Sequence, residues 1–358
     1  MTLIIDAHED IAWNILCYGR DYAQSAADIR AREANRTDIH METGSATLGL
    51  PDWLAGNVAV IFATLFVEPK RSPYASSFSK TYTTPDEAFD VAMRQIDIYR
   101  RLADEHPQFR LIHTQADLDS VLASWQGETE RHIGLVLLME NADPIRKPDE
   151  VERWYEEGLR LVGPAWMATR YCGGTSEPGP LTDDGIRLLR HMQDLNMILD
   201  TSHMAEQSFF QAVERYDGPI IASHSNPRRY VDIDRNLSDD MIRALIERDG
   251  VIGIVPFNSF LVPNWRRTRG DRKDAANIDT IVRTIDYVCQ RAGDAQHVAL
   301  GTDLDGGFGA ESTPMGIDTV ADLQKVAVGL TEAGYAQADI EAVMNGNWLR
   351  ILRQSLPA

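Results

Sequence analysis

The sequence predicts a (β/α)8 barrel, because eight short apolar runs alternate with longer amphipathic segments along 358 residues. Each run has the length and the Val, Ile and Leu content of a buried strand. The eight runs span residues 2–8, 57–66, 133–141, 160–166, 196–203, 219–225, 250–257 and 297–306. A strand followed by a helix, repeated along the chain, implies a parallel sheet.

The segments between the runs have the apolar spacing near 3.6 and the acidic starts of amphipathic helices. The clearest of them span residues 84–106, 182–195, 205–216 and 238–250. Eight strand and helix units favour a closed barrel over an open doubly wound sheet, which would usually have fewer strands and a glycine-rich first turn. No GxGxxG pattern follows the first run, which agrees with the barrel.

We expect one domain spanning residues 1–358, because no shift in composition and no low-complexity tract divides the chain. Residues 36–82 interrupt the alternation with stretches rich in Gly, Ser, Thr and Pro on both sides of the second run. These stretches are expected to form long loops at the face of the barrel that carries the active site.

The charge balance limits the partners that this chain can bind. Acidic residues number 54 against 35 basic ones, and the net charge of −19 repels nucleic acid and anionic membrane surfaces. Cys17, Cys172 and Cys289 stand at unrelated spacings, so neither a disulfide framework nor a zinc knuckle is expected. The N-terminus lacks a signal-peptide pattern, and no apolar run reaches a membrane-spanning length. We therefore expect a cytoplasmic protein.

Metal-binding side chains stand at the ends of five predicted strands, where the active site of a barrel forms. A single histidine at a strand end is more often a packed or surface residue than a ligand. Acid or imidazole at five ends is hard to explain by packing, since each would be a costly buried polar group. Imidazole and carboxylate suit Zn²⁺, and a carboxylate on a middle strand can bridge two ions. The residues are His8, Asp10, Glu140, His203, His224, Asp303 and Asp305.

Five motifs together resemble those of a known family. Their order, and the 21-residue separation of His203 from His224, resemble those of the motifs in the membrane dipeptidase (renal dipeptidase) family of metallopeptidases, within the amidohydrolase superfamily. The resemblance covers nearly the whole chain and implies a barrel with a binuclear zinc site. The motifs are DAHED at 6–10, LLMEN at 137–141, LDTSHM at 199–204, ASHSNPRRYVDIDRNLSDD at 222–240 and ALGTDLDG at 299–306.

The resemblance implies a role for each residue of the metal site. His8 and Asp10 would hold one zinc ion, and His203 and His224 would hold the second. Glu140 would bridge the two ions. A water shared by two zinc ions loses its proton near neutral pH and can attack an amide carbonyl that a metal polarises.

Further residues are expected to handle protons and substrate. Asp303 would take the proton from the bridging water and pass it to the leaving amine, as the resemblance implies. Asp305 would orient its loop, and Asp6 would support the metal ligands from behind. The resemblance also implies that Arg235 pairs with the terminal carboxylate of the substrate, to which a guanidinium offers two parallel donors.

Trp166 departs from the family pattern, which usually has a histidine at the end of strand four that contacts the substrate carbonyl. Either the indole N–H of Trp166 stabilises the oxyanion, or Arg170 or Tyr171 does so, or the substrates differ from ordinary dipeptides. Trp166 as simple packing at the barrel mouth is an equal alternative. We expect compensation, with Arg170 ahead of Tyr171 because a cation responds more strongly to developing negative charge.

The sequence thus predicts a zinc-dependent hydrolase of dipeptides, and it leaves open whether a D-residue is accepted at the C-terminal position. Two rivals remain: a metal-dependent lactonase or ester hydrolase on the same barrel, and a metal-holding binding protein without turnover. Retention of the five metal ligands and Asp303 argues against the second rival. No hydrophobic tail for a lipid anchor follows the last motif, so a soluble enzyme is expected, and a homodimer stays an open alternative.

Overall fold

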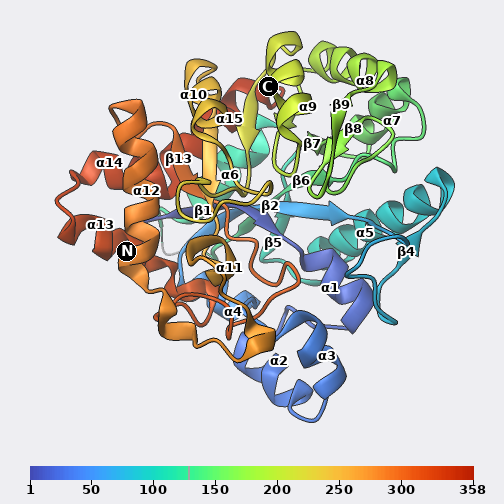
Figure 1. Ribbon diagram of the computed structural model, residues 1–358. Helices are drawn as coiled ribbons and strands as arrows, with labels where there is room; N and C mark the ends of the chain where they lie inside the picture. Colours follow the sequence, from blue (N-terminus) through green and yellow to red (C-terminus); the bar gives the residue numbers. More distant parts are fainter. Residues whose placement is uncertain (128–129) are drawn as a thin grey trace.

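Eight parallel strands form the barrel, in the order in which they follow one another along the chain (Figure 1). The structure is a computed structural model, and it describes residues 1–127 and 130–358. Each predicted run overlaps one of the eight strands, so the predicted (β/α)8 fold is confirmed. The strands are β1 (Ile4–Glu9), β2 (Val58–Phe66), β6 (Ile133–Glu140), β7 (Leu159–Gly163), β10 (Ile198–Asp200), β11 (Ile220–Ala222), β12 (Val251–Ile254) and β13 (Val298–Leu300).

The barrel closes where β1 meets the segment that follows β13. The carbonyl of His8 accepts a hydrogen bond of 3.0 Å from the backbone N–H of Asp303. The buried carboxylate of Asp6 accepts a hydrogen bond of 2.7 Å from the backbone N–H of Thr302, and it also accepts one from the Thr302 hydroxyl. Asp6 therefore ties the strand that carries His8 to the strand that leads to Asp303.

Side chains alternate between the two sides of β1. Ile5 and Ala7 belong to an apolar cluster that includes Trp348 of the last helix, α15 (Asn347–Ser355). Asp6 and His8 lie on the other side of the strand, and all six residues of β1 are buried. Apolar packing on one side thus holds the polar side chains on the other in a fixed position.

Two glycines bring β11 close to its neighbours. A Cβ at Gly253 or Gly301 would lie 1.8 or 1.7 Å from the carbonyl oxygen of Ser223, which is a distance that no side chain tolerates. The absence of both side chains lets the end of β11 pack against β12 and β13. This packing sets the position of His224, the residue that follows Ser223.

The four predicted helices are present as α5 (Pro85–Glu105), α8 (Asp183–Asp194), α9 (Glu206–Arg215) and α10 (Asp239–Glu247). The hydroxyls of Thr84, Thr182 and Ser238 cap α5, α8 and α10 by accepting a hydrogen bond from a backbone N–H of the first turn. Further helices outside residues 36–82 are α1 (Ile11–Tyr18), α2 (Ala26–Glu33), α6 (Gln115–Ser124), α7 (Val151–Glu156), α11 (Asn258–Leu261), α12 (Ile278–Ala292), α13 (Gln324–Glu332) and α14 (Gln337–Glu341).

The stretch 36–82 is more regular than predicted. It contains helices α3 (Thr37–Thr43) and α4 (Leu50–Ala55) before β2, and the paired strands β3 (Glu68–Pro69) and β4 (Thr81–Tyr82) after it. Helices this short give too few turns for a periodic pattern, so tertiary packing decides them. The expectation of long loops therefore holds only for the segments between these elements.

The loop after β7 contains an antiparallel hairpin that was not predicted, made of β8 (Cys172–Gly174) and β9 (Glu177–Leu181). Strand β5 (Phe109–Leu111) pairs with the first residues of β6. Across the described parts of the chain, the three cysteines are free and no helix has the length and apolarity to cross a membrane. Short helical turns lie at η1 (Pro148–Glu150), η2 (Arg267–Arg269), η3 (Lys273–Ala275), η4 (Val320–Leu323) and η5 (Ala342–Gly346).

A buried carboxylate, Asp305, anchors the segments that surround the mouth of the barrel. Its oxygens accept hydrogen bonds from the Tyr22 hydroxyl at 2.6 Å and from the backbone N–H and hydroxyl of Thr47 at 2.8 and 2.7 Å. The guanidinium of Arg20, which is also fully buried, lies 3.1 Å from the same carboxylate. Asp305 thus joins the loop after β13 to two segments near the N-terminus.

We predict that Asp305→Ala lowers the free energy of unfolding by about 3–5 kcal/mol, because it leaves the buried donors of Tyr22 and Thr47 without their acceptor and removes one of the two carboxylates that pair with the buried Arg20. Chemical unfolding of the metal-free protein measures the change. As a control, Asp240→Ala removes an exposed partner of Arg243 and should change stability by less than about 1 kcal/mol. Equal effects of the two substitutions would contradict the anchoring role of Asp305.

Candidate metal centre

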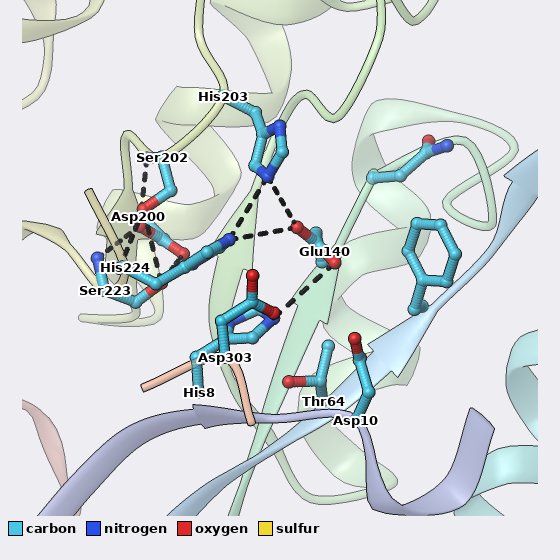
Figure 2. Close-up of polar contacts among 12 residues, drawn as sticks. His8, Asp10, Thr64, Glu140, Asp200, Ser202, His203, Ser223, His224 and Asp303 are labelled. Atoms are coloured by element: carbon cyan, nitrogen blue, oxygen red, sulfur yellow. Dashed lines mark hydrogen bonds and ion pairs between the residues drawn. The ribbon is translucent and has the colours of Figure 1, made fainter. Parts of the chain in front are cut away.

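Glu140, the last residue of β6, lies among three imidazoles at the C-terminal ends of the strands (Figure 2). Its Oε1 atom is 3.0 Å from Nε2 of His203 and 3.2 Å from Nε2 of His224. Its Oε2 atom faces the other way and lies 3.6 Å from Nε2 of His8. One carboxylate therefore contacts two separate groups of side chains through its two oxygens.

The imidazole of His224 is oriented by a chain of two polar residues. The Ser223 hydroxyl lies 2.5 Å from an oxygen of Asp200 and 2.7 Å from Nδ1 of His224. Because the carboxylate can only accept, Ser223 donates its one proton to Asp200 and accepts from the N–H at Nδ1 of His224. The lone pair of Nε2 on His224 is then directed at Glu140.

Thr175, in the turn of the β8–β9 hairpin, orients His203 in the same way. Its hydroxyl lies 3.0 Å from Nδ1 of His203 and can donate to the His203 carbonyl at 3.4 Å. When the hydroxyl donates to this carbonyl, Nδ1 is the donor of the ring and Nε2 is left as an acceptor. His203 has a left-handed backbone, with φ of 66°, which turns its side chain toward Glu140.

Three acceptors consequently meet at one point. The Nε2 atoms of His203 and His224 are 3.2 Å apart, and Oε1 of Glu140 is within the same distance of both. Burial, together with the charge of Arg235, lowers the pKa of His203 to about 4. Burial and the charge of His8 also lower the pKa of His224, so both rings are neutral at pH 7. Three converging lone pairs repel one another unless a cation lies between them.

The second group of side chains contains buried polar atoms without partners. Both ring nitrogens of His8 and Oδ1 of Asp10 have no hydrogen-bond partner among residues 1–127 and 130–358. His8, Asp10 and Glu140 each offer an atom within 4.8 Å of the others, as do Glu140, His203 and His224. A buried polar atom without a partner costs about 1–3 kcal/mol, which a bound metal ion would offset. Imidazole and carboxylate in this arrangement fit divalent metals such as Zn²⁺.

The electrostatics around Glu140 agree with a cation at this place. Burial disfavours a charged His8, but Glu140, Asp10 and Asp303 outweigh burial and raise the pKa of His8 to about 10. Burial alone would raise the pKa of Glu140, but the charge of His8 is the main effect that holds it well below its usual range. In the absence of metal, the centre therefore keeps a proton as its positive charge.

Asp303 lies at the edge of this centre, with Oδ1 at 3.9 Å from Nε2 of His8. Burial and the charge of Glu140 raise the pKa of Asp303 to about 7, against the opposite effects of His8 and Arg235. A carboxyl group that titrates near neutral pH can both accept and return a proton.

Arg235 approaches the centre from the loop after β11. Its guanidinium is buried, donates to the carbonyl of His224 at 2.6 Å and to the hydroxyl of Ser225 at 2.9 Å, and lies over the ring of Phe260. Burial lowers the pKa of Arg235, while Asp303 and Glu140 act in the opposite direction. Arg235 is therefore a buried cation next to the candidate metal centre.

Trp166 borders the centre, and its ring lies 6.3 Å from that of His203. Its indole also packs edge to face against Phe66 at 5.0 Å and Tyr74 at 6.2 Å. The position fits both a contact with substrate and packing at the barrel mouth, which are the two alternatives drawn from the sequence.

The structure does not bring Arg170 or Tyr171 to the centre. The guanidinium of Arg170 donates to the carbonyls of Asp143 and Arg146 and pairs with the Asp143 carboxylate at 3.4 Å. Tyr171 is fully buried, and its hydroxyl donates to the carbonyl of Ile145. Both side chains hold the loop after β6. The expected compensation by Arg170 for the missing histidine is therefore not supported, because each of its three guanidinium nitrogens already donates to Asp143 or Arg146.

Three residues at the centre were not singled out from the sequence: Thr175, Asp200 and Ser223. A carboxylate at the end of the fifth predicted strand was a visible signal for Asp200. Thr175 gave no signal, because its contact with His203 depends on the unpredicted hairpin. Asp200 also lies near His8 and His224, but its oxygens already accept from two backbone N–H groups and the Ser223 hydroxyl.

Comparisons with known proteins extend these observations. An uncharacterized protein in the pqqA 5' region of Klebsiella pneumoniae is 30% identical over 282 residues, which cover 76% of this chain and 98% of that protein. An uncharacterized dipeptidase of Schizosaccharomyces pombe is 26% identical over 303 residues, covering 83% and 70% of the two chains.

Solved structures show the same fold at lower identity. A metallo peptidase from Rhodobacter sphaeroides, liganded with a phosphinate mimic of the dipeptide L-Ala-D-Ala, is 23% identical with a TM-score of 0.79, covering 99% of this chain and 100% of that one. The probable dipeptidase PvdM from Pseudomonas aeruginosa is 21% identical with a TM-score of 0.80, covering 99% and 96%. The model of the membrane dipeptidase family matches residues 1–356. The resemblance inferred from the five motifs is thereby confirmed, and the chain belongs to the membrane dipeptidase family of metallopeptidases, peptidase family M19.

Proposed function

We propose that this metallodipeptidase binds two zinc ions that share Glu140. His8 and Asp10 complete one site, and His203 and His224 complete the other. The observation that carries the proposal is the convergence of acceptors on both oxygens of Glu140, with partnerless atoms on His8 and Asp10. When bound, the two ions supply Lewis-acid chemistry: they lower the pKa of water toward neutrality and polarise the amide carbonyl.

The side chains around the centre then have separate roles in the proposed reaction. Asp303 accepts the proton of the attacking water and returns it to the leaving amine, from a position 3.9 Å from Nε2 of His8. Asp200 and Ser223 hold the tautomer of His224, and Thr175 holds that of His203. Asp6 keeps β1 in register with the segment that carries Asp303.

Arg235 binds the terminal carboxylate of the substrate. The buried Arg235 guanidinium donates to two neutral partners, Ser225 and the His224 carbonyl, so its charge can pair directly with a carboxylate of the substrate. A carboxylate is the anion that every free dipeptide carries, and pairing with it fixes the scissile bond next to Glu140. We propose that a D-residue is accepted at the C-terminal position, in line with the L-Ala-D-Ala mimic bound by the Rhodobacter sphaeroides peptidase.

A substrate panel tests the reaction class. The zinc-loaded protein should hydrolyse free dipeptides, including those with a C-terminal D-residue, and should act poorly on lactones and simple esters. The reverse preference would favour the lactonase or esterase alternative. The three free cysteines fit a reducing compartment, and we propose a cytoplasmic location on that ground.

The first prediction for this centre concerns metal content. Elemental analysis of the zinc-loaded protein should find about two ions per chain, as a centre with one bridging carboxylate requires. His8→Ala should lower the content to about one ion, while Glu140→Gln should lower it further because both sites lose a ligand. His106→Ala, which changes a histidine outside the centre, is the matched control. Full occupancy in Glu140→Gln would remove the basis of the binuclear site.

The second prediction concerns pH. Because His8 has a pKa of about 10 without metal, a metal ion must displace its proton, and zinc affinity should rise with pH up to that value. We expect about a tenfold gain per pH unit for each proton released between pH 6 and 8. Competition titrations with a chelator measure the slope, which should be smaller in His8→Ala. A slope of zero in the wild-type protein would contradict the prediction.

The third prediction concerns Arg235. Arg235→Met should lower kcat/KM for free dipeptides by a factor that corresponds to about 2–4 kcal/mol of transition-state stabilisation, because a charge-assisted contact with the carboxylate is lost. C-terminally amidated dipeptides should be poor substrates of the wild-type enzyme and should lose little more in the variant. Arg229→Met, at an exposed position of the same loop, is the control. Equal wild-type rates on free and amidated dipeptides would count against carboxylate binding.

A further inference from the structure

The turn that follows β13 holds Asp303 in an unusual backbone conformation. Asp303 and Asp305 have φ angles of 56° and 62°, and Gly307 has φ of 78°. The backbone N–H of Gly306 donates a hydrogen bond of 2.9 Å to the carbonyl of Asp303, which closes the turn. Gly306 therefore lies directly against the residue proposed as the general base.

The space beside Gly306 is filled by the carboxyl group of Asp303. A Cβ at position 306 would lie 1.9 Å from Oδ1 and 2.7 Å from Cγ of Asp303, and 2.8 Å from its carbonyl oxygen. Non-bonded carbon and oxygen atoms need about 3.5 Å, so the carboxyl group would have to move by more than an ångström. A methyl group at this position cannot coexist with the observed orientation of Asp303.

The φ of Gly306 is outside the left-handed region occupied by Gly307, so its dihedral angle does not require glycine. The 2.8 Å distance to the Asp303 carbonyl oxygen is the one backbone contact that a Cβ would also have to relieve, and it is much less severe than the 1.9 Å distance to the carboxyl group. Gly307 shows the opposite situation: it has a positive φ, and a Cβ there would meet no atom within 4 Å. Of these two adjacent glycines, one serves the backbone of the turn and the other leaves room for a side chain.

We infer that Gly306 is a positioning residue for catalysis: its missing side chain reserves the volume in which the Asp303 carboxyl group faces His8 and the metal centre. The inference rests on the proposed function, in which Asp303 transfers the proton. Gly306 acts only through Asp303 and touches neither the substrate nor a metal ligand in this scheme.

Kinetics of the zinc-loaded enzyme test this role. Gly306→Ala should lower kcat for a good dipeptide substrate at least tenfold, with KM and zinc content unchanged, because the base is displaced while the substrate and metal sites stay intact. In an Asp303→Ala background the same substitution should change kcat less than twofold. Gly307→Ala, the control, should lower thermal stability but keep kcat within about twofold of wild type. Equal losses in both backgrounds would overturn the inference.

Crystal structures test the placement independently of activity. The Asp303 carboxyl group should have rotated away from position 306 in Gly306→Ala, and an unchanged Asp303 side chain would overturn the inference. If the wild-type enzyme hydrolyses no dipeptide, the proposed function fails, and this structural comparison still decides the role of Gly306. If Gly306→Ala does not fold, Asp303→Ala/Gly306→Ala should fold because the obstructing carboxyl group is absent. Failure of this double variant would assign the glycine to the backbone and refute the inference.

Discussion

A single buried carboxylate, Glu140, determines the arrangement of the candidate metal centre. An ionised carboxylate in the interior of a barrel is costly unless positive charge or donors surround it. Here its neighbours include two imidazoles whose tautomers direct lone pairs toward it, at 3.0 and 3.2 Å. Such an arrangement is favourable only with a cation present. The tautomers of His203 and His224 are therefore stronger evidence for a cation site than the presence of two histidines alone.

The barrel supplies the positions, and polar contacts between distant segments supply the orientations. Parallel strands that end at one face bring residues from along the whole chain to one place. The side chains are then fixed by hydroxyl groups: Ser223 from the neighbouring residue, and Thr175 from a hairpin inserted after β7. Asp305 holds the surrounding segments in the same way through buried polar contacts. The orientation of the side chains at the centre thus depends on residues that, in the proposed scheme, bind neither metal nor substrate.

The strands and the residues at their ends could be predicted because strand and helix periodicities are local, and a closed parallel sheet then determines which ends meet. The partners of those residues could not. Thr175 reaches His203 through a hairpin too short to leave a periodic pattern. Arg170 was expected at the centre because it is close to Trp166 in sequence, but Asp143, 27 residues earlier, holds its guanidinium. Side-chain direction in a loop depends on such distant neighbours.

The contact between β1 and the segment after β13 has a consequence for how the molecule is made. Asp6 and Thr302 are 296 residues apart, so the contact that closes the barrel forms only after residues 6–302 have been synthesised. His8 and Asp303 lie on the two sides of this contact, so Asp303 reaches its place beside His8 only in the closed barrel. The five proposed metal ligands lie between residues 8 and 224, so closing the barrel adds the proposed proton-transfer residue to a set of ligands that precedes it in the chain.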